Sequence, residues 1–126
     1  MSRLIGWVDV RLKKPMLLVH TLSGKTFSVT VDTGFNRELW MDKITAETLG
    51  VAMLSTHPRT SFVTAGNKPI LTDVGELEIM WVLGPRKVFV HIHDEPGLSE
   101  VLLGTGLLHP GVLIVEFSND MVKIDS

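Results

Sequence analysis

Short stretches of alternating apolar and polar residues recur along the chain and predict β-strands. In the clearest one, Phe27, Val29 and Val31 face one side and Ser28 and Thr30 face the other, and the strand then stops at Asp32. We expect further strands, each bounded by turn residues, at positions 4–12, 16–19, 39–41, 60–64, 70–72, 76–83, 87–93, 112–117 and 121–124. Short strands at regular spacing indicate an all-β barrel or sandwich.

The pattern predicts only one or two short helices. Asp42 is placed to cap a helix over Lys43 to Leu49, which Gly50 would end. Thr105 to Leu108 is expected to form one helical turn before Pro110. The chain is therefore mainly β.

Composition limits the classes of protein to which the chain can belong. With 126 residues, of which 44% are hydrophobic, it is expected to fold as one domain, 1–126, with a real core. A formal charge of −2 predicts no nucleic-acid partner and no anionic membrane partner. The chain has no cysteine and shows neither a signal-peptide pattern nor an apolar run of membrane-spanning length, so a cytoplasmic location is expected.

Asp32, Thr33 and Gly34 are the residues that suggest chemistry. A carboxylate at the end of a packed strand is held still and points away from the sheet, although Asp-x-Gly is also common in ordinary turns. Hydrolysis of an amide by carboxylates needs two of them, one ionised and one protonated. The chain has no second Asp-Thr-Gly, since Asp73-Val74-Gly75 lacks the hydroxyl. If Asp32 is catalytic, a two-fold homodimer is required to supply its partner.

These features together resemble the retropepsins, the single-domain aspartic proteases, and most of all their bacterial relatives. The resemblance covers nearly the whole chain and implies a closed barrel of short strands. It also implies that Asp32 is catalytic, that the Thr33 hydroxyl bridges two protomers and that Gly34 leaves room for substrate. Leu102, Leu103 and Gly104 match the motif that packs beside the catalytic loop. A flap over the bound peptide is expected at Thr64, Ala65, Gly66 and Asn67.

The resemblance further implies the partners and the assembly. A peptide or protein substrate would bind in an extended form across the two-fold axis of the homodimer, and no metal or organic cofactor is implied. The chain end from Met121 to Ser126 is expected to interleave into the interface sheet, by analogy with the family. The cleavage preference and the physiological substrate do not follow from the sequence.

Two positions depart from the family pattern. Phe35 stands where many members carry Ala, Ser or Thr. The missing hydroxyl predicts a pH optimum that is only mildly acidic, and the bulk of the ring leaves open an inactive or narrow-pocket variant. Gly106 stands where a polar residue is common, and it predicts a looser helical turn.

Other readings of the sequence stay open beside the protease. A retropepsin-fold module without activity would dimerise or bind peptide. A metal-dependent hydrolase would use His91 and His93, which lie two apart on a strand and therefore face the same side, with Asp94 or Glu95 as a third ligand. On spacing alone, the two histidines are more simply exposed residues at a strand end. Gly104-Thr105-Gly106 lacks the βαβ context of a dinucleotide loop.

Overall fold

A single sheet with two short helices forms the molecule. The computed structural model describes residues 3–63 and 66–126. The strands are β1 (Arg3–Asp9), β2 (Lys14–His20), β3 (Thr26–Val31), β4 (Leu39–Asp42), β5 (Ala52–Met53), β6 (Thr60–Val63), β7 (Pro69–Trp81), β8 (Gly84–His93), β9 (Leu102–Leu103), β10 (Val112–Glu116) and β11 (Met121–Asp125). The helices are α1 (Lys43–Leu49) and α2 (Thr105–Leu108), and the 3₁₀ turn η1 (Phe117–Asn119) joins β10 to β11.

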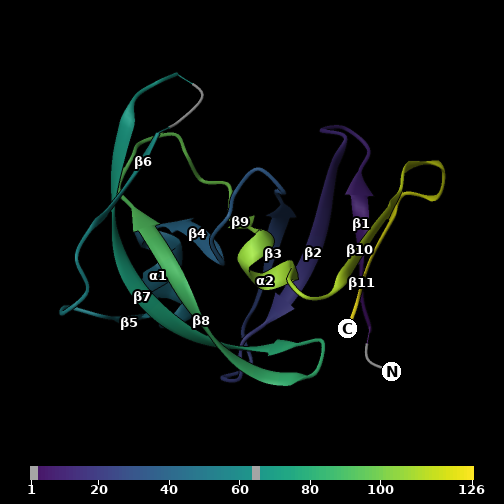
Figure 1. Ribbon diagram of the computed structural model, residues 1–126, viewed down its shortest axis with the longest axis horizontal. Helices are drawn as coiled ribbons and strands as arrows, with labels where there is room; N and C mark the ends of the chain where they lie inside the picture. The colour runs from purple at the N-terminus through teal and green to yellow at the C-terminus, as the bar shows by residue number, and fades with distance from the viewer. Residues whose placement is uncertain (1–2, 64–65) are drawn as a thin grey trace.

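The strands follow an open path in the order β10-β11-β1-β2-β3-β9-β4-β8-β7-β5, with β6 paired to β7 off this path. In Figure 1, β1, β2, β10 and β11 stand on one side of the molecule and β6, β7 and β8 on the other, with β9 and α2 between them. Within the described residues, β10 and β5 form the two ends of this path and are not paired with each other. Backbone hydrogen bonds therefore do not close the sheet into the expected barrel.

The main core lies along the inner face of this curved sheet. The strand that leads to Asp32 contributes Val29, which is fully buried, and β4 contributes Leu39 and Met41. Leu103 of β9 is equally buried and packs in the same cluster. The alternation read from the sequence therefore separates the core face from the outer face as expected.

A second, smaller group of buried residues, here called the aromatic cluster, lies beside the main core. It consists of Phe35, Trp40 and Ile70, with the partly buried Phe62 and Leu102 packed against them. Phe35 follows the Asp32 loop, whereas Phe62 belongs to the β6–β7 hairpin. The aromatic cluster therefore links the hairpin to the loop that carries Asp32.

The predicted helix α1 is confirmed, together with both of its end signals. The side chain of Asp42 accepts a hydrogen bond of 2.7 Å from the Thr45 amide. Gly50 ends the helix in the left-handed conformation, with φ of 76°. These contacts are local in sequence, which is why the residue pattern was sufficient to predict them.

Two strand boundaries differ from the prediction. The first strand ends at Asp9, because the Asp9 carboxylate accepts hydrogen bonds from the Arg11 and Leu12 amides and closes a turn there. The segments predicted at 70–72 and 76–83 form one continuous strand, β7, which runs through Gly75. A side chain at Gly75 would collide with Val51, so this glycine permits close packing and does not mark a break.

No helix in the described ranges is long and apolar enough to cross a lipid bilayer.

Candidate functional site

Asp32 lies directly beyond the end of two parallel strands. β3 pairs with β9 so that Val31 lies opposite Leu103. The Asp32 amide continues this pairing with a 2.9 Å hydrogen bond to the Leu103 carbonyl oxygen. The backbone at Asp32 is thus fixed by the sheet, while its side chain remains partly exposed.

The residues after Asp32 hold one oxygen of its carboxylate. The Gly34 amide donates a 2.9 Å hydrogen bond to Oδ1, and the Phe35 amide donates to the Asp32 carbonyl oxygen at 3.1 Å. A side chain at Gly34 would approach Oδ1 within about 3.2 Å, so glycine keeps this turn tight. In the described part of the chain Oδ2 has no hydrogen-bond partner, which leaves it free to bind a water molecule.

Leu102, Leu103 and Gly104 lie beside this loop, and hydrogen bonds from Gly104 and Thr105 hold it in place. The Gly104 amide donates to the Glu38 carbonyl oxygen at 3.0 Å, and the Thr105 amide donates to the Phe35 carbonyl oxygen at 2.8 Å. A Cβ atom at Gly104 would collide with the carbonyl oxygens of Phe35 and Arg37. Glycine at this position is therefore required for the close approach of the two segments.

Gly106 does not loosen the helical turn, contrary to the sequence prediction. Its amide donates to the Arg37 carbonyl oxygen at 3.1 Å, and an added Cβ would lie 2.9 Å from that oxygen. The turn α2 forms over the expected residues, Thr105–Leu108. A glycine here lets α2 pack directly on the loop that follows Asp32.

The ring of Phe35 points into the aromatic cluster. It is 8% exposed, and its centroid lies 6.2 Å from that of Trp40 and 5.9 Å from that of Phe62. Phe35 is also absent from the residues that line the pocket around Asp32. The concern that its bulk narrows the site is therefore not supported, because the ring is part of the packed interior.

The predicted flap falls at the tip of the β6–β7 hairpin, where Val63 pairs with Pro69. Thr64 and Ala65 lie outside the described residues. Gly66 and Asn67 are exposed, and Asn67 has a positive φ of 57°. The hairpin is anchored near the Asp32 loop through the contact of Phe62 with Phe35.

His91 and His93 are buried, 5% and 1% exposed, so the prediction of two exposed histidines is wrong. Their face of β8 is covered by aromatic rings: His91 packs on Phe62 at 5.0 Å and His93 on Trp40 at 4.7 Å between centroids. The Nδ1 of His91 lies 3.3 Å from the Thr72 hydroxyl, and the Nδ1 of His93 accepts a 3.1 Å hydrogen bond from the backbone amide two residues on.

Burial favours the neutral form of both imidazoles. Burial, together with a smaller effect from the positive charge of Arg37, lowers the pKa of His91 to about 4. Burial also lowers the pKa of His93, against the opposing effect of the nearby carboxylates, Asp42 first among them. Within the described ranges, no three His, Asp or Glu side chains converge as a metal site requires, so the geometry gives the metal-hydrolase reading no support.

A pocket of about 410 Å³ opens beside Asp32 and contains a carboxylate that the sequence prediction missed. Its walls come from β2, β3 and the loop after it, the loop before β9, β9, β10 and η1: Lys14, Pro15, Thr30, Val31, Asp32, Thr33, Glu100, Leu102, Leu113, Val115 and Phe117. Glu100 lies in the loop before β9, and its position near Asp32 depends on the pairing of β9 with β3. No local signal in the sequence indicates this proximity.

Glu100 is held by two hydrogen bonds on the same oxygen. Its Oε2 accepts from the Thr30 hydroxyl at 2.8 Å and from the Lys14 ammonium at 2.9 Å. Burial alone would raise the pKa of Glu100, but the bonds from Lys14 and Thr30 outweigh it, and the pKa is lowered. The carboxylate is therefore ionised at neutral pH.

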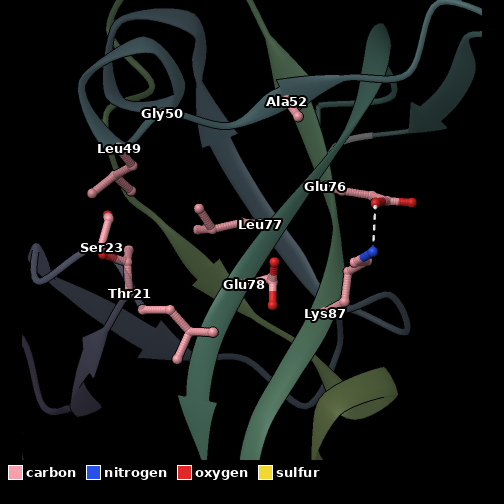
Figure 2. Close-up of a pocket in the computed structure, with 10 residues that line it drawn as sticks. Thr21, Ser23, Leu49, Gly50, Ala52, Glu76, Leu77, Glu78 and Lys87 are labelled. Carbon is pink, nitrogen blue, oxygen red and sulfur yellow. Dashed lines mark hydrogen bonds and ion pairs between the residues drawn. The ribbon is translucent and has the colours of Figure 1, made fainter.

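Another pocket, of about 550 Å³, lies elsewhere (Figure 2). It is lined by the Thr21–Ser23 turn before β3, by the end of α1 and by β7, whereas Asp32 follows the other end of β3. Figure 2 shows Glu76 turned toward Lys87 and away from Glu78, with 3.9 Å between the charged atoms of the ion pair. Glu76 and Glu78 are therefore not arranged as a proton-sharing pair of carboxylates.

Comparison with known proteins identifies the fold. No family model matches the sequence, and no curated protein matches it. Among solved structures, the chain is similar to a retropepsin-like aspartic protease from Rickettsia conorii, with a TM-score of 0.71 and 19% sequence identity over 98% of this chain and 89% of that one. The molecule therefore has a retropepsin-like fold, as the resemblance of its sequence implied.

Proposed function

We propose that this protein is an aspartic endopeptidase that works as a homodimer. The observation that carries the proposal is the setting of Asp32: its backbone is fixed by the β3–β9 pairing, its Oδ1 is bound by the Gly34 amide and its carboxylate opens on a pocket. A retropepsin-like fold with an acid at this position supports the same reading. Two copies of Asp32 would share one proton, so that one activates water while the other polarises the peptide carbonyl.

A single chain supplies only one such carboxylate. Asp73, in the segment that most resembles a second Asp-Thr-Gly, lies inside β7 and forms an ion pair with Arg59 at 3.0 Å. Glu100 shares the pocket but is bound to Lys14 and Thr30 in its ionised form. The proton-sharing partner of Asp32 therefore has to come from a second copy, with the Thr33 hydroxyls bridging the two protomers below the site.

The proposed interface differs from the one expected from the chain end. β11 is paired with β1 on one edge and with β10 on the other, so Met121 to Ser126 offers no free strand edge to a partner. In the described residues the outer edge of β10 is unpaired, and its Val112 and Ile114 side chains are 55% and 38% exposed. Residues of β10 also line the pocket beside Asp32, so a partner docked along this edge would lie next to the site.

The test is a peptide-library digest between pH 4 and 7 with wild type and with Asp32→Asn. We expect cleavage by the wild-type dimer and at least a thousandfold loss in the variant, because the amide cannot share a proton. Asp73→Asn makes the same chemical change at the exposed Asp73 and serves as the matched control, which is expected to stay active. Sedimentation velocity reports the mass of all three proteins.

The outcomes separate the candidate functions. Cleavage that persists in Asp32→Asn would contradict the proposed role of Asp32, and cleavage abolished by a chelator would favour a metal-dependent hydrolase. A dimeric wild type that cleaves no peptide at any pH would leave the alternative of a retropepsin-fold module that dimerises or binds peptide.

A further inference from the structure

We infer that Glu100 determines the specificity of this site by selecting peptides with an arginine or lysine side chain next to the scissile bond. This inference rests on the proposed peptidase function and extends it to the class of substrate. It starts from the pocket of about 410 Å³ that Asp32 and Glu100 line together.

Glu100 and Asp32 lie near each other because both line the same pocket. Thr30, which binds Glu100, lies in β3 two residues before Asp32, and all three residues line the pocket. Two residues of strand span about 7 Å. A substrate bound with its scissile carbonyl at Asp32 would therefore direct an adjacent side chain toward Glu100.

Glu100 is prepared to bind a cation. The Thr30 hydroxyl orients the carboxylate through Oε2, and the backbone next to it is fixed because the Thr30 amide donates to the Val101 carbonyl oxygen at 2.8 Å. Oε1 has no hydrogen-bond partner in the parts of the chain that the structure describes. An incoming guanidinium or ammonium group would thus meet an ionised, oriented acceptor.

Lys14 occupies the carboxylate in the free protein but is easily displaced. Its side chain is 44% exposed and that of Glu100 is 42% exposed, and ion pairs this exposed contribute little to stability. The lysine side chain can swing into solvent around its four rotatable bonds, whereas the Thr30 hydroxyl stays on the strand. A substrate cation would therefore replace Lys14 while Glu100 keeps its orientation.

The other walls of the pocket suit the same kind of side chain. The charged residues that line it are Asp32, Glu100 and Lys14, which leaves an excess of negative charge that disfavours acidic side chains. Most of the remaining lining is apolar: Pro15, Val31, Leu102, Leu113, Val115 and Phe117. Apolar walls with a carboxylate at one end match the methylene stem and cationic head of arginine or lysine.

Peptide pairs that differ only by arginine or by citrulline, its neutral analogue of similar shape, test the inference. With wild type we expect kcat/KM to be about tenfold higher for the arginine peptide, and Glu100→Gln to remove most of that ratio. Glu100→Lys should reverse the preference toward peptides with glutamate at the same position. Glu78→Gln, which changes an exposed carboxylate of the other pocket, is the control and should keep the wild-type ratio.

A binding measurement makes the result independent of catalysis. Asp32→Asn should bind the arginine peptide about tenfold more tightly than the citrulline peptide, and Asp32→Asn/Glu100→Gln should bind both equally. If wild type cleaves peptides without a preference for basic side chains, or if Glu100→Gln leaves the ratio unchanged, the inference is wrong while the peptidase proposal stands. If no protein cleaves, equal binding of the two peptides by Asp32→Asn overturns the inference separately.

Discussion

Acidification is expected to destabilise the fold through His91. This histidine is 5% exposed among aromatic rings, and its pKa of about 4 lies below the 6.5 of an exposed imidazole. Because the unfolded chain binds the proton more tightly than the folded chain, the stabilisation is complete above pH 6.5 and is lost as the pH falls from 6.5 through 4. One proton changes the free energy of unfolding by about 1.4 kcal/mol per pH unit, so the loss from His91 is about 3 kcal/mol.

The pH window separates His91 and His93 from the carboxylates. Burial lowers the pKa of His93 as well, so its effect adds to that of His91. Asp42 and Glu100 have lowered pKa values too, but as acids they contribute stability that is lost only as the pH falls below about 4.5 and through their folded pKa values. A decline in stability between pH 6.5 and 4.5 therefore reports the buried histidines.

Urea denaturation followed by tryptophan fluorescence measures this dependence. We expect the free energy of unfolding of wild type to fall by at least 2 kcal/mol between pH 6.5 and 4.5. His91→Phe keeps an aromatic ring in the cluster without a titrating group, so its slope should be smaller by about 1.4 kcal/mol per pH unit. His20→Gln, at an exposed position, is the control. A slope in His91→Phe equal to that of wild type would refute the reasoning.

Two further predictions concern packing and assembly. Phe35→Ala should lower the free energy of unfolding by about 3 kcal/mol in urea, because it empties the centre of the aromatic cluster, whereas Phe117→Ala, at a ring 62% exposed, should change it by less than about 1 kcal/mol. Ile114→Glu should shift the chain to monomer in sedimentation, because it places a charge on the proposed β10 edge, while Lys123 opposite it offsets that charge within the fold.

Each of these two predictions has a clear contrary result. Equal destabilisation by Phe35→Ala and Phe117→Ala would show that the aromatic cluster adds no more stability than an exposed ring. An Ile114→Glu protein that stays dimeric, or a Leu83→Glu control at the exposed β7–β8 turn that becomes monomeric as well, would remove the β10 edge from the interface.

The sequence was most informative where the determinants are local. The capped helix α1 and the strand that leads to Asp32 depend on residues within a few positions of one another, and both are found as predicted. The early turn at Asp9 was missed, although it is local, because a side-chain cap outweighed the apolar alternation through Val10 and Leu12.

The sequence was least informative where distant segments meet. The environments of Glu100 and His91 are set by residues from other parts of the chain, Thr30 for Glu100 and Phe62 for His91. Alternation along β8 does not reveal that aromatic rings cover the face that carries His91. The same holds for β11, whose two neighbours come from opposite ends of the chain, and for the sheet, which stays open at β10 and β5. The sequence alone suggested that the Phe35 ring would narrow the site. The ring instead packs against Trp40 and Phe62, and these contacts cannot be read from the sequence.

The pairing of the short strand β9 determines at which stage of folding the site around Asp32 can form. It pairs with β3 on one side and with β4 on the other, and the clamp from Thr105 to Phe35 joins residues 70 positions apart in the chain. Contacts of such long sequence separation form late in folding, because the intervening chain must be ordered first. A growing chain that has not yet reached residue 106 would lack the clamp on Asp32, so an unfinished protein would carry no assembled site during its synthesis.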